Sequence, residues 1–307
     1  MLTNFPNGVS SFGVPLTGAS RVDPSGTVYF VDGNSGNDGN DGLSWSYPKK
    51  TLLHTFSVSH SDIARGSDRW ARRNTIFIAG DSFTETLTAF PQKTDVIGVG
   101  SYNGHKGASV CGNHAPVNSA VGTRFINVNF EPVTAADIMT LTGVTWGAEF
   151  IGCSFKAQDS GDSGIIAISA IQFTACPHDK VIDCEFIGAF TGDVIDIAAG
   201  AASSMVIRGN TIIGGANNGI VVSGVATISK GRRGLIADNF IDVAAKTIDT
   251  RATSVFNCID NRCISANAVG GTAYVIDASF AAGNIVTGNG AAITIPDLLG
   301  RTTETPS

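Results

Sequence analysis

The sequence predicts an all-β protein, a right-handed parallel β-helix (solenoid) of about nine to eleven coils, with a short N-terminal arm and a capping helix. Three observations carry this prediction. A six-residue unit recurs eight times, about every 26 residues, over more than half of the 307 residues. No helical pattern separates the copies. Charged residues make up only 15% and glycines number 37, against averages of about 25% charged and about 7% glycine.

The unit has the pattern apolar-Ile-x-x-(Asn or polar)-(Phe or apolar). Its copies are VIGVGS at Val96, FINVNF at Phe125, FIGCSF at Phe150, VIDCEF at Val181, VIRGNT at Val206, LIADNF at Leu235, CIDNRC at Cys258 and a degraded FAAGNI at Phe280. Each copy reads as a strand, a corner and the start of a second strand. Repetition at this period describes one coil of a parallel β-helix, stacked about 4.8 Å above the previous one.

Side chains in a strand alternate between two faces, so positions two and four of the unit share a face. We expect position two to form an inward ladder of isoleucines: Ile97, Ile126, Ile151, Ile182, Ile207, Ile236 and Ile259. Position five is Asn129, Asn210, Asn239 and Asn284 in four copies. Asparagine tolerates the left-handed backbone of a tight turn, so we expect these residues to form the corner.

A further Ile- and Val-rich strand follows each of several units: DIMTLTG at Asp137, GIIAISA at Gly164, DVIDIAA at Asp193, GIVVSGV at Gly219 and AYVIDAS at Ala273. Upstream, VYFVD at Val28 is a strand candidate, and the segment 49–66 has apolar residues spaced for a short helix that covers the first coil. Residues 75–100 read as two or three more strands.

These patterns divide the chain into an N-terminal anchoring arm (1–26), the capped start of the β-helix (27–95), the repeats (96–292) and a C-terminal tail (293–307). The arm is rich in Gly, Pro and Ser and lacks strand periodicity. It either docks on another subunit or folds back on its own helix. A formal net charge of −6 disfavours nucleic acid as a partner. No apolar run is long enough to span a membrane, and the first residues do not resemble a secretion signal.

Twelve residues after each unit start lie Asp137, Asp162, Asp193, Asn218 and Thr247. On neighbouring coils, Asp162 and Asp193 would lie roughly 5 Å apart, as the two carboxylates of a retaining glycosidase do. The alternative is that these side chains accept backbone hydrogen bonds where a turn enters a strand. Asn218 and Thr247 continue the series and favour this alternative, because neither can act as a carboxylic acid.

Other reactive residues give weaker signals. The carboxylates of the 32–41 loop lack the spacing of an EF-hand, and no His spacing indicates zinc, so we expect no metal and no cofactor. Six cysteines include no CxxC pair, and Cys153 and Cys184 are expected to stack inside the solenoid as small apolar residues. A basic cluster, Arg65, Arg69, Arg72 and Arg73, is either a solvated surface or a docking site.

The segments VYFVDGNSGNDGNDGLSWSYPKKTL and NTIFIAGDSFTETLTAFPQKTDVIGVG resemble the opening of pectate-lyase-like right-handed parallel β-helix proteins, a superfamily represented among bacteriophage tailspikes and other virion proteins. The resemblance covers about residues 27–290. Asn4 to Ser20 also resembles the leader of some phage head-associated proteins. A pectate-lyase-type enzyme would need a calcium-binding carboxylate cluster, and none recurs at matching offsets.

The resemblance implies a non-enzymatic virion structural protein, a homotrimeric head decoration or cement protein that is assembled in the host bacterial cytoplasm and bound to the major capsid protein. The expected binding residues are Asn4, Phe5, Pro6, Phe12, Pro15, Arg65, Arg69, Arg72 and Arg73. The alternative is a tailspike or receptor-binding protein that binds or hydrolyses host surface polysaccharide, with Asp162 and Asp193 as its catalytic pair.

Overall fold

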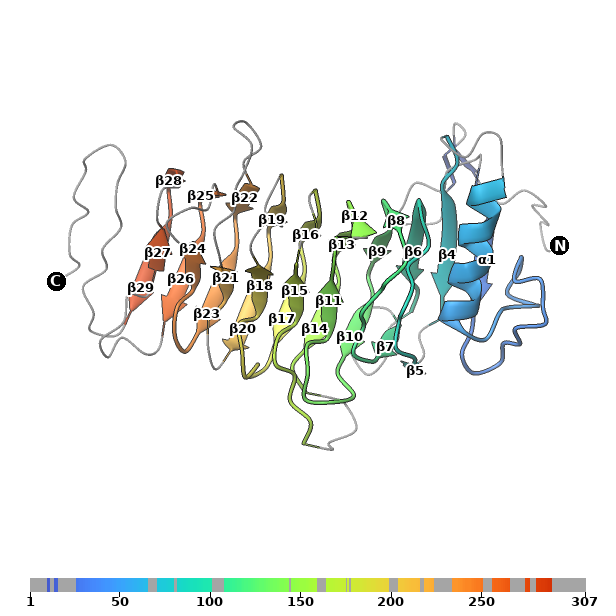
Figure 1. The fold of residues 1–307 in the computed structure, drawn as a ribbon, viewed down its shortest axis with the longest axis horizontal. Coiled ribbons are helices and arrows are strands. Elements are labelled where there is room, and N and C mark those ends of the chain that lie inside the picture. The colour runs from blue at the N-terminus through green and yellow to red at the C-terminus, as the bar shows by residue number, and fades with distance from the viewer. Residues whose placement is uncertain are drawn as a thin grey trace.

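The computed structural model describes residues 10–11, 14–15, 26–65, 71–79, 82–100, 108–143, 145–158, 164–174, 176, 178–198, 204–215, 218–223, 234–250, 256–265, 274–276 and 280–288. These residues form an elongated stack of coils in which strands from successive coils pair side by side (Figure 1). All ladders between coils are parallel in the described strands. The predicted all-β parallel β-helix is confirmed.

Three long sheets run along the solenoid. Sheet 1 contains β3 (Val28–Val31), β4 (Asn74–Ile78), β6 (Thr94–Gly98), β9 (Arg124–Ile126), β13 (Glu149–Ile151), β16 (Lys180–Ile182), β19 (Val206–Arg208), β22 (Gly234–Ala237), β25 (Phe256–Ile259) and β28 (Phe280–Ala282). Sheet 2 contains β5 (Ser82–Thr84), β7 (Ser109–Cys111), β10 (Asn129–Glu131), β14 (Ser154–Lys156), β17 (Glu185–Ile187), β20 (Thr211–Gly215), β23 (Phe240–Val243), β26 (Arg262–Ser265) and β29 (Ile285–Gly288).

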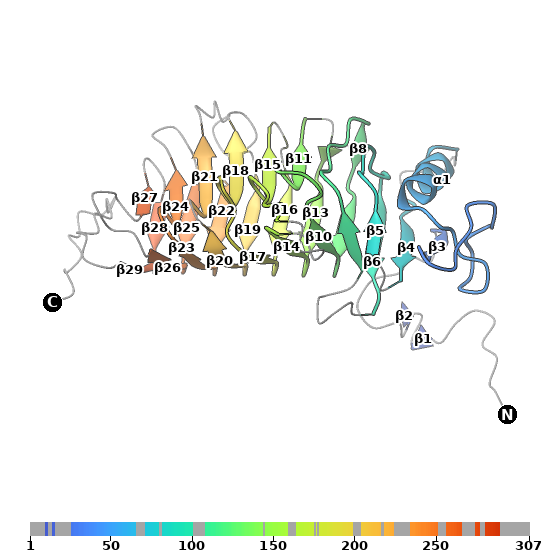
Figure 2. The same ribbon diagram turned by 90° about the horizontal axis from the view of Figure 1, so that it is seen from below.

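Sheet 3 contains β11 (Met139–Leu141), β15 (Ile171–Phe173), β18 (Ile195–Ala198), β21 (Ile220–Ser223), β24 (Ile248–Thr250) and β27 (Tyr274–Ile276). Two small pairs complete the strands: β8 (Ala120–Val121) with β12 (Thr145–Trp146), and the antiparallel β1 (Ser10–Ser11) with β2 (Val14–Pro15). A typical coil runs from sheet 1 through a tight corner into sheet 2, then through a longer loop into sheet 3, as Figure 2 shows from below.

The repeat units fall into two registers, and this corrects the predicted isoleucine ladder. In the second to fourth copies position one is buried: Phe125, Phe150 and Val181 occupy equivalent places in the ladder. Ile126, Ile151 and Ile182 therefore point outward, since neighbouring residues of a strand face opposite sides. In later copies Ile207 and Ile236 do point inward, as predicted, whereas Ile259 does not, because Cys258 is the register partner of Ile236.

The left-handed corner residue explains the shift. It is the third residue of the unit at Asn127, Gly152 and Asp183, but the fourth at Gly209 and Asp238. Moving the corner by one residue reverses which strand residues face the core. The prediction that the position-five asparagines adopt the left-handed conformation was wrong, because the residue that does so precedes them.

Four asparagines instead form a ladder next to the corner, and we call Asn210, Asn239, Asn261 and Asn284 the Asn ladder. The first three are buried, and Asn284 is partly exposed. The Nδ2 of each of the first three donates to the Oδ1 of the next, at 2.8–2.9 Å. The same Oδ1 atoms accept backbone N–H groups from the coil before. Each asparagine thus joins two coils. Asn261 is the fourth residue of the CIDNRC unit, whereas the other three members are the fifth residues of their units.

Stacked phenylalanines fill the core between sheets 1 and 2. Phe130, Phe155 and Phe186 occupy successive coils with ring centroids 5.0 Å apart at each step. Phe125 and Phe150 stack in the same way on sheet 1 at 5.6 Å. All five are buried. Parallel stacking of identical side chains is the natural packing when each coil repeats the one below it.

The predicted capping helix is present as α1 (Leu52–Arg65), beside β3 and β4 at the N-terminal end (Figure 1). Leu52, Phe56 and Ile63 face the core. The first turn is held by Glu85, whose two carboxylate oxygens accept the N–H groups of Leu52 and Leu53 at 2.9 and 3.1 Å. A carboxylate at this end satisfies unpaired donors and complements the helix dipole.

His114 gives the core a pH-dependent weakness. Its ring is buried, its Nδ1 accepts the N–H of Leu87 at 3.0 Å, and burial lowers its pKa from 6.5 to about 4, against a smaller opposing effect of the Val110 carbonyl. The unfolded chain therefore binds a proton below pH 6.5 that the folded chain accepts only near pH 4. We expect stability to fall by roughly 3 kcal/mol as the pH drops through this window. His114→Asn keeps an acceptor for Leu87 and should remove this part of the pH dependence of the unfolding free energy. Denaturant titrations at pH 7, 5.5 and 4 measure it. An unchanged pH dependence would contradict the assignment to His114.

Candidate functional site

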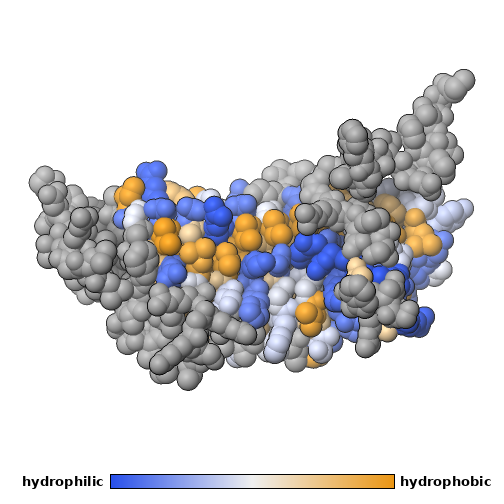
Figure 3. All heavy atoms as spheres, turned by 90° about the horizontal axis from the view of Figure 1, so that it is seen from above, coloured by the Kyte–Doolittle hydropathy of each residue, from blue (hydrophilic) through white to orange (hydrophobic). Residues whose placement is uncertain are grey.

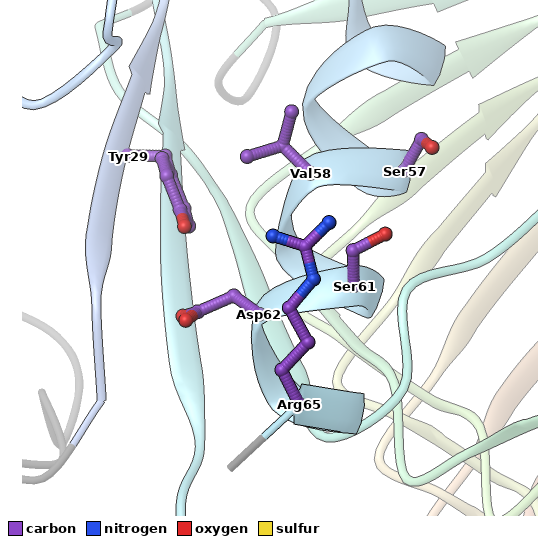
Figure 4. Close-up of a pocket in the computed structure, with 6 residues that line it drawn as sticks. All are labelled: Tyr29, Ser57, Val58, Ser61, Asp62 and Arg65. Carbon is purple, nitrogen blue, oxygen red and sulfur yellow. The ribbon is translucent and has the colours of Figure 1, made fainter.

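A pocket of about 300 Å³ opens at the N-terminal end between α1 and β3 (Figure 4). Ser57, Val58, Ser61, Asp62 and Arg65 line it from one face of α1, and Tyr29 lines it from β3. These helix residues share a face because they are spaced three and four apart. Figure 4 shows the carboxylate of Asp62 pointing toward Tyr29, while Arg65 extends along the helix past Ser61 toward Val58.

The two charged residues of the pocket have different environments. Asp62 accepts hydrogen bonds from Thr27 and Asn74 and pairs with Arg72 at 3.2 Å. Although burial favours the neutral acid, these contacts lower the pKa of Asp62. Arg65 is exposed and forms no ion pair with any described residue. The pocket therefore offers one cationic group and several hydroxyls to a ligand.

Beside this end, the 42–47 turn exposes large apolar side chains. Trp45 and Tyr47 are 47% and 63% exposed, and Leu43 is 53% exposed. The Trp45 ring rests on Phe30, with centroids 4.9 Å apart. The turn is held by Gly42 and Tyr47, whose backbones hydrogen-bond at 3.1 Å. We call Leu43, Trp45 and Tyr47 the apolar turn; contiguous exposed aromatics of this kind mark interaction surfaces.

The carboxylates near the apolar turn accept backbone hydrogen bonds that hold the surrounding loop in place. Asp38 accepts the N–H groups of Lys50 and Thr51, and Asp32 accepts those of Asn34 and Ser35. These hydrogen bonds lower the pKa of Asp38, against the opposing effect of burial. No group of three or more His, Cys, Asp and Glu residues with metal-site geometry occurs within the described ranges.

The predicted basic cluster divides into different roles. Arg65 lines the pocket, whereas Arg72 pairs with Asp62 and Arg73 binds Asp95 and the Gly122 carbonyl, both at 2.8 Å. Arg72 and Arg73 thus link elements of the chain itself, and the docking role of the cluster stays a prediction. Pro15 lies in β2, at the same end of the solenoid (Figure 2). Asn4, Phe5, Pro6, Phe12 and Arg69 lie outside the described residues.

The register does not support the predicted carboxylate pair. Asp193 lies two residues before Ile195, and the equivalent residue in the previous coil, two before Ile171, is Ser169. Asp162 precedes Ser169 by seven residues and lies outside the described part of the chain. The prediction counted a fixed offset, but this coil carries an insertion after β14. Asp137 accepts the N–H of Ser169 at 3.1 Å, and Asp193 accepts the side-chain amide of Asn218 at 2.7 Å. The described side chains of this series therefore form hydrogen bonds at turns.

A second pocket, of about 210 Å³, lies on the outer side of sheet 2 beside Lys156, between Ile166 and Ile187. Behind it Glu131 is completely buried and pairs with Lys156 at 3.3 Å. The Glu131 carboxylate also accepts hydrogen bonds from Ser109 and Asn129 at 3.0 and 2.6 Å. Sequence reasoning missed this ion pair, although its signal was available: Glu131 and Lys156 each follow directly after a repeat unit in successive copies.

The six cysteines are free thiols, as expected from their spacing. Cys153 and Cys184 are buried, and each donates its S–H to a carbonyl of the preceding coil, of Phe125 and Phe150, at 3.4 Å. Burial raises the pKa of Cys176 to about 12 and, together with the neighbouring Cys153, raises that of Cys184. The predicted role of Cys153 and Cys184 as stacked apolar residues is confirmed. No described helix is long and apolar enough to cross a bilayer.

Comparison with known proteins gives likeness in fold. No protein-family model matches the chain, and no curated protein sequence does. A structure titled "Rhamnogalacturonan lyase" is 11% identical, with a TM-score of 0.46 over 80% of this chain and 75% of that one. The crystal structure of pectate lyase Pel9A is 14% identical, with a TM-score of 0.48 over 90% of this chain and 81% of that one.

Both solved structures are named as lyases, so the sequence-based expectation that this chain is not an enzyme is contradicted and is withdrawn. At 11% and 14% identity, the likeness does not carry their activity to this chain. The ladders of sheets 1 to 3 by themselves show that the chain is a parallel β-helix.

Proposed function

We propose that this β-helix is a structural protein of a bacteriophage virion, a homotrimer on the head that docks onto the major capsid protein through its N-terminal end. The apolar turn carries the proposal. Leu43, Trp45 and Tyr47 are exposed at the same end of the solenoid as the pocket that presents Arg65. Exposed aromatics and arginines are the residue types that dominate protein–protein interfaces.

The position of these groups supports docking by one end. The loop that carries the apolar turn, helix α1 and the hairpin β1–β2 all lie at the N-terminal end of the solenoid (Figure 2). A long solenoid bound by this end projects away from the surface that holds it. The resemblance of the first residues to the leader of head-associated proteins agrees with this orientation.

The test is co-sedimentation of the purified chain with capsids of the phage that encodes it. Trp45→Ala combined with Tyr47→Ala should weaken binding at least tenfold, because aromatic hot spots each contribute on the order of 2 kcal/mol. Trp146→Ala is the matched control, since Trp146 is 52% exposed but lies in β12. Equal binding by the double variant and wild type, or no binding by wild type, would refute the docking role.

A second candidate function is binding or cleavage of host surface polysaccharide, as on a tailspike. The pocket beside Lys156 favours it, because Ile166 and Ile187 form aliphatic walls that fit the apolar face of a sugar ring next to the Glu131–Lys156 ion pair. Ile166→Asp, which leaves that ion pair in place, should abolish retention on the immobilised polysaccharide and any release of reducing ends. Unchanged retention would remove this site.

A further inference from the structure

The isoleucines that turn outward form a band on the outer face of sheet 1. Ile126, Ile151 and Ile182 are register partners in three successive coils, and each is partly exposed. Toward the N-terminus the same row contains Ile97, which is buried, and Phe77, which is partly exposed. Beyond β16 the row reaches Arg208, and the apolar band passes to the adjoining row, at Val206 and Leu235.

Figure 3 shows the molecule from the side on which the strands of sheet 1 lie in Figure 1, and apolar side chains form a band along its long axis. The band crosses coil after coil, so it is not a set of scattered surface residues. Parallel sheets are usually covered on both faces, and a continuous apolar patch on a protein surface indicates a partner.

Four charges in the row beside the band cancel one another, and Arg73 adds a second partner for Asp95. The row two residues before the isoleucines carries Asp95, Arg124, Glu149 and Lys180, which alternate in sign. Arg124 pairs with Asp95 at 2.6 Å and Lys180 with Glu149 at 2.7 Å. The whole chain has a net charge of −6, so most faces of two copies repel each other. This face does not, because its charges are already paired within one chain.

The dimensions of the face suit an elongated partner with the same repeat. The ten strands of sheet 1, spaced about 4.8 Å apart, make a face about 43 Å long. Three-residue strands add a width of about 10 Å, giving on the order of 400 Å² before the side chains of the edges are counted. A standard interface takes about 800 Å² per partner, so this face supplies the apolar centre and its edges supply the rim.

We propose that the outer face of sheet 1 is a self-association surface that binds a second copy of this chain. A copy presents the same coil spacing, the same apolar band and the same self-neutralised charges, so coils can match over the full length. This inference concerns the contact between copies of the chain and goes beyond the proposed docking on the capsid. Its test uses the isolated protein and does not depend on capsid binding.

The experiment measures molar mass by light scattering across a concentration series from 1 to about 100 μM. Wild type should associate into a species of two or more 31.6 kDa chains. Ile151→Lys combined with Ile182→Lys should remain monomeric at the highest concentration, with unchanged β-sheet circular dichroism, because two buried cations would face each other across the contact.

The matched control is Ile187→Lys combined with Ile213→Lys. These isoleucines are also register partners in neighbouring coils, but they lie on sheet 2 and are 45% and 44% exposed. This control should associate as wild type does, and so should a chain lacking residues 2–25. A monomeric wild type, dissociation of the sheet 2 control or loss of association on removing the arm would each overturn the proposal. Association without capsid binding would instead refute only the docking role.

Discussion

Phe155→Ala is expected to destabilise the protein by about 4 kcal/mol. The Phe155 ring is completely buried and lies between Phe130 and Phe186, with centroids 5.0 Å from each and interplanar angles of 19° and 7°. It also meets the edge of Phe150 at 5.7 Å. Truncation of a buried phenylalanine removes its transfer free energy and leaves a cavity, which together cost about 3–5 kcal/mol. The neighbours are fixed by their own coils and cannot collapse into the space.

Equilibrium denaturation in urea checks this value. Phe77→Ala is the matched control, because Phe77 also stacks on a phenylalanine, Phe30, at 5.8 Å, but is partly exposed on the outer face of sheet 1. It should cost no more than about 1.5 kcal/mol. A solenoid distributes its stability over neighbouring coils, so Phe155→Ala should also broaden the transition. A loss below about 1.5 kcal/mol would show that the stack does not support the core.

The sequence was sufficient to predict the solenoid because each coil repeats the same pattern of strands and corners. Strand alternation, glycine content and a period of about 26 residues all point to one architecture. The register within the unit was not predictable from the same pattern. One residue more or less before the corner leaves the repeat sequences nearly aligned but reverses which strand residues face the core. Ile151 faces outward, whereas Ile207, at the same position of its unit, faces inward.

The candidate sites were less predictable, because they depend on loops and on contacts between coils. Asp162 and Asp193 align by counting, but the insertion after β14 puts Ser169 in register with Asp193. Trp45 is unremarkable in sequence and becomes notable because Phe30 supports its ring at the surface. Arg65 and Arg72 look equivalent in a basic cluster, yet Arg65 lies on α1 and lines a pocket, whereas Arg72 lies just before β4 and pairs with Asp62.

Asn239→Ala is expected to cost about 3 kcal/mol or more, since it removes a central member of the Asn ladder. Asn239 is 1% exposed. Its Oδ1 accepts from the backbone N–H and the Nδ2 of Asn210 at 3.0 and 2.9 Å. Its Nδ2 donates to the Ile207 carbonyl and to the Oδ1 of Asn261 at 3.1 and 2.8 Å. Alanine leaves several buried polar groups unpaired, and each such group costs about 1–3 kcal/mol.

Asn239→Asp separates the loss of hydrogen bonds from the loss of volume. The aspartate keeps an acceptor for Asn210, but its second oxygen faces the Ile207 carbonyl and the Asn261 Oδ1, so the ionised form is disfavoured. The pKa of this acid is therefore expected to rise in the folded protein. Since the folded state then binds a proton that the unfolded state releases, the variant should be most stable below about pH 4 and lose stability as the pH rises.

Asn34→Ala, in the exposed 32–41 loop, is the control and should change the unfolding free energy by less than about 0.5 kcal/mol. Equal stabilities of Asn239→Asp and wild type at pH 7 would mean that the ladder does not join the coils, because a buried carboxylate facing two acceptors cannot be neutral in cost.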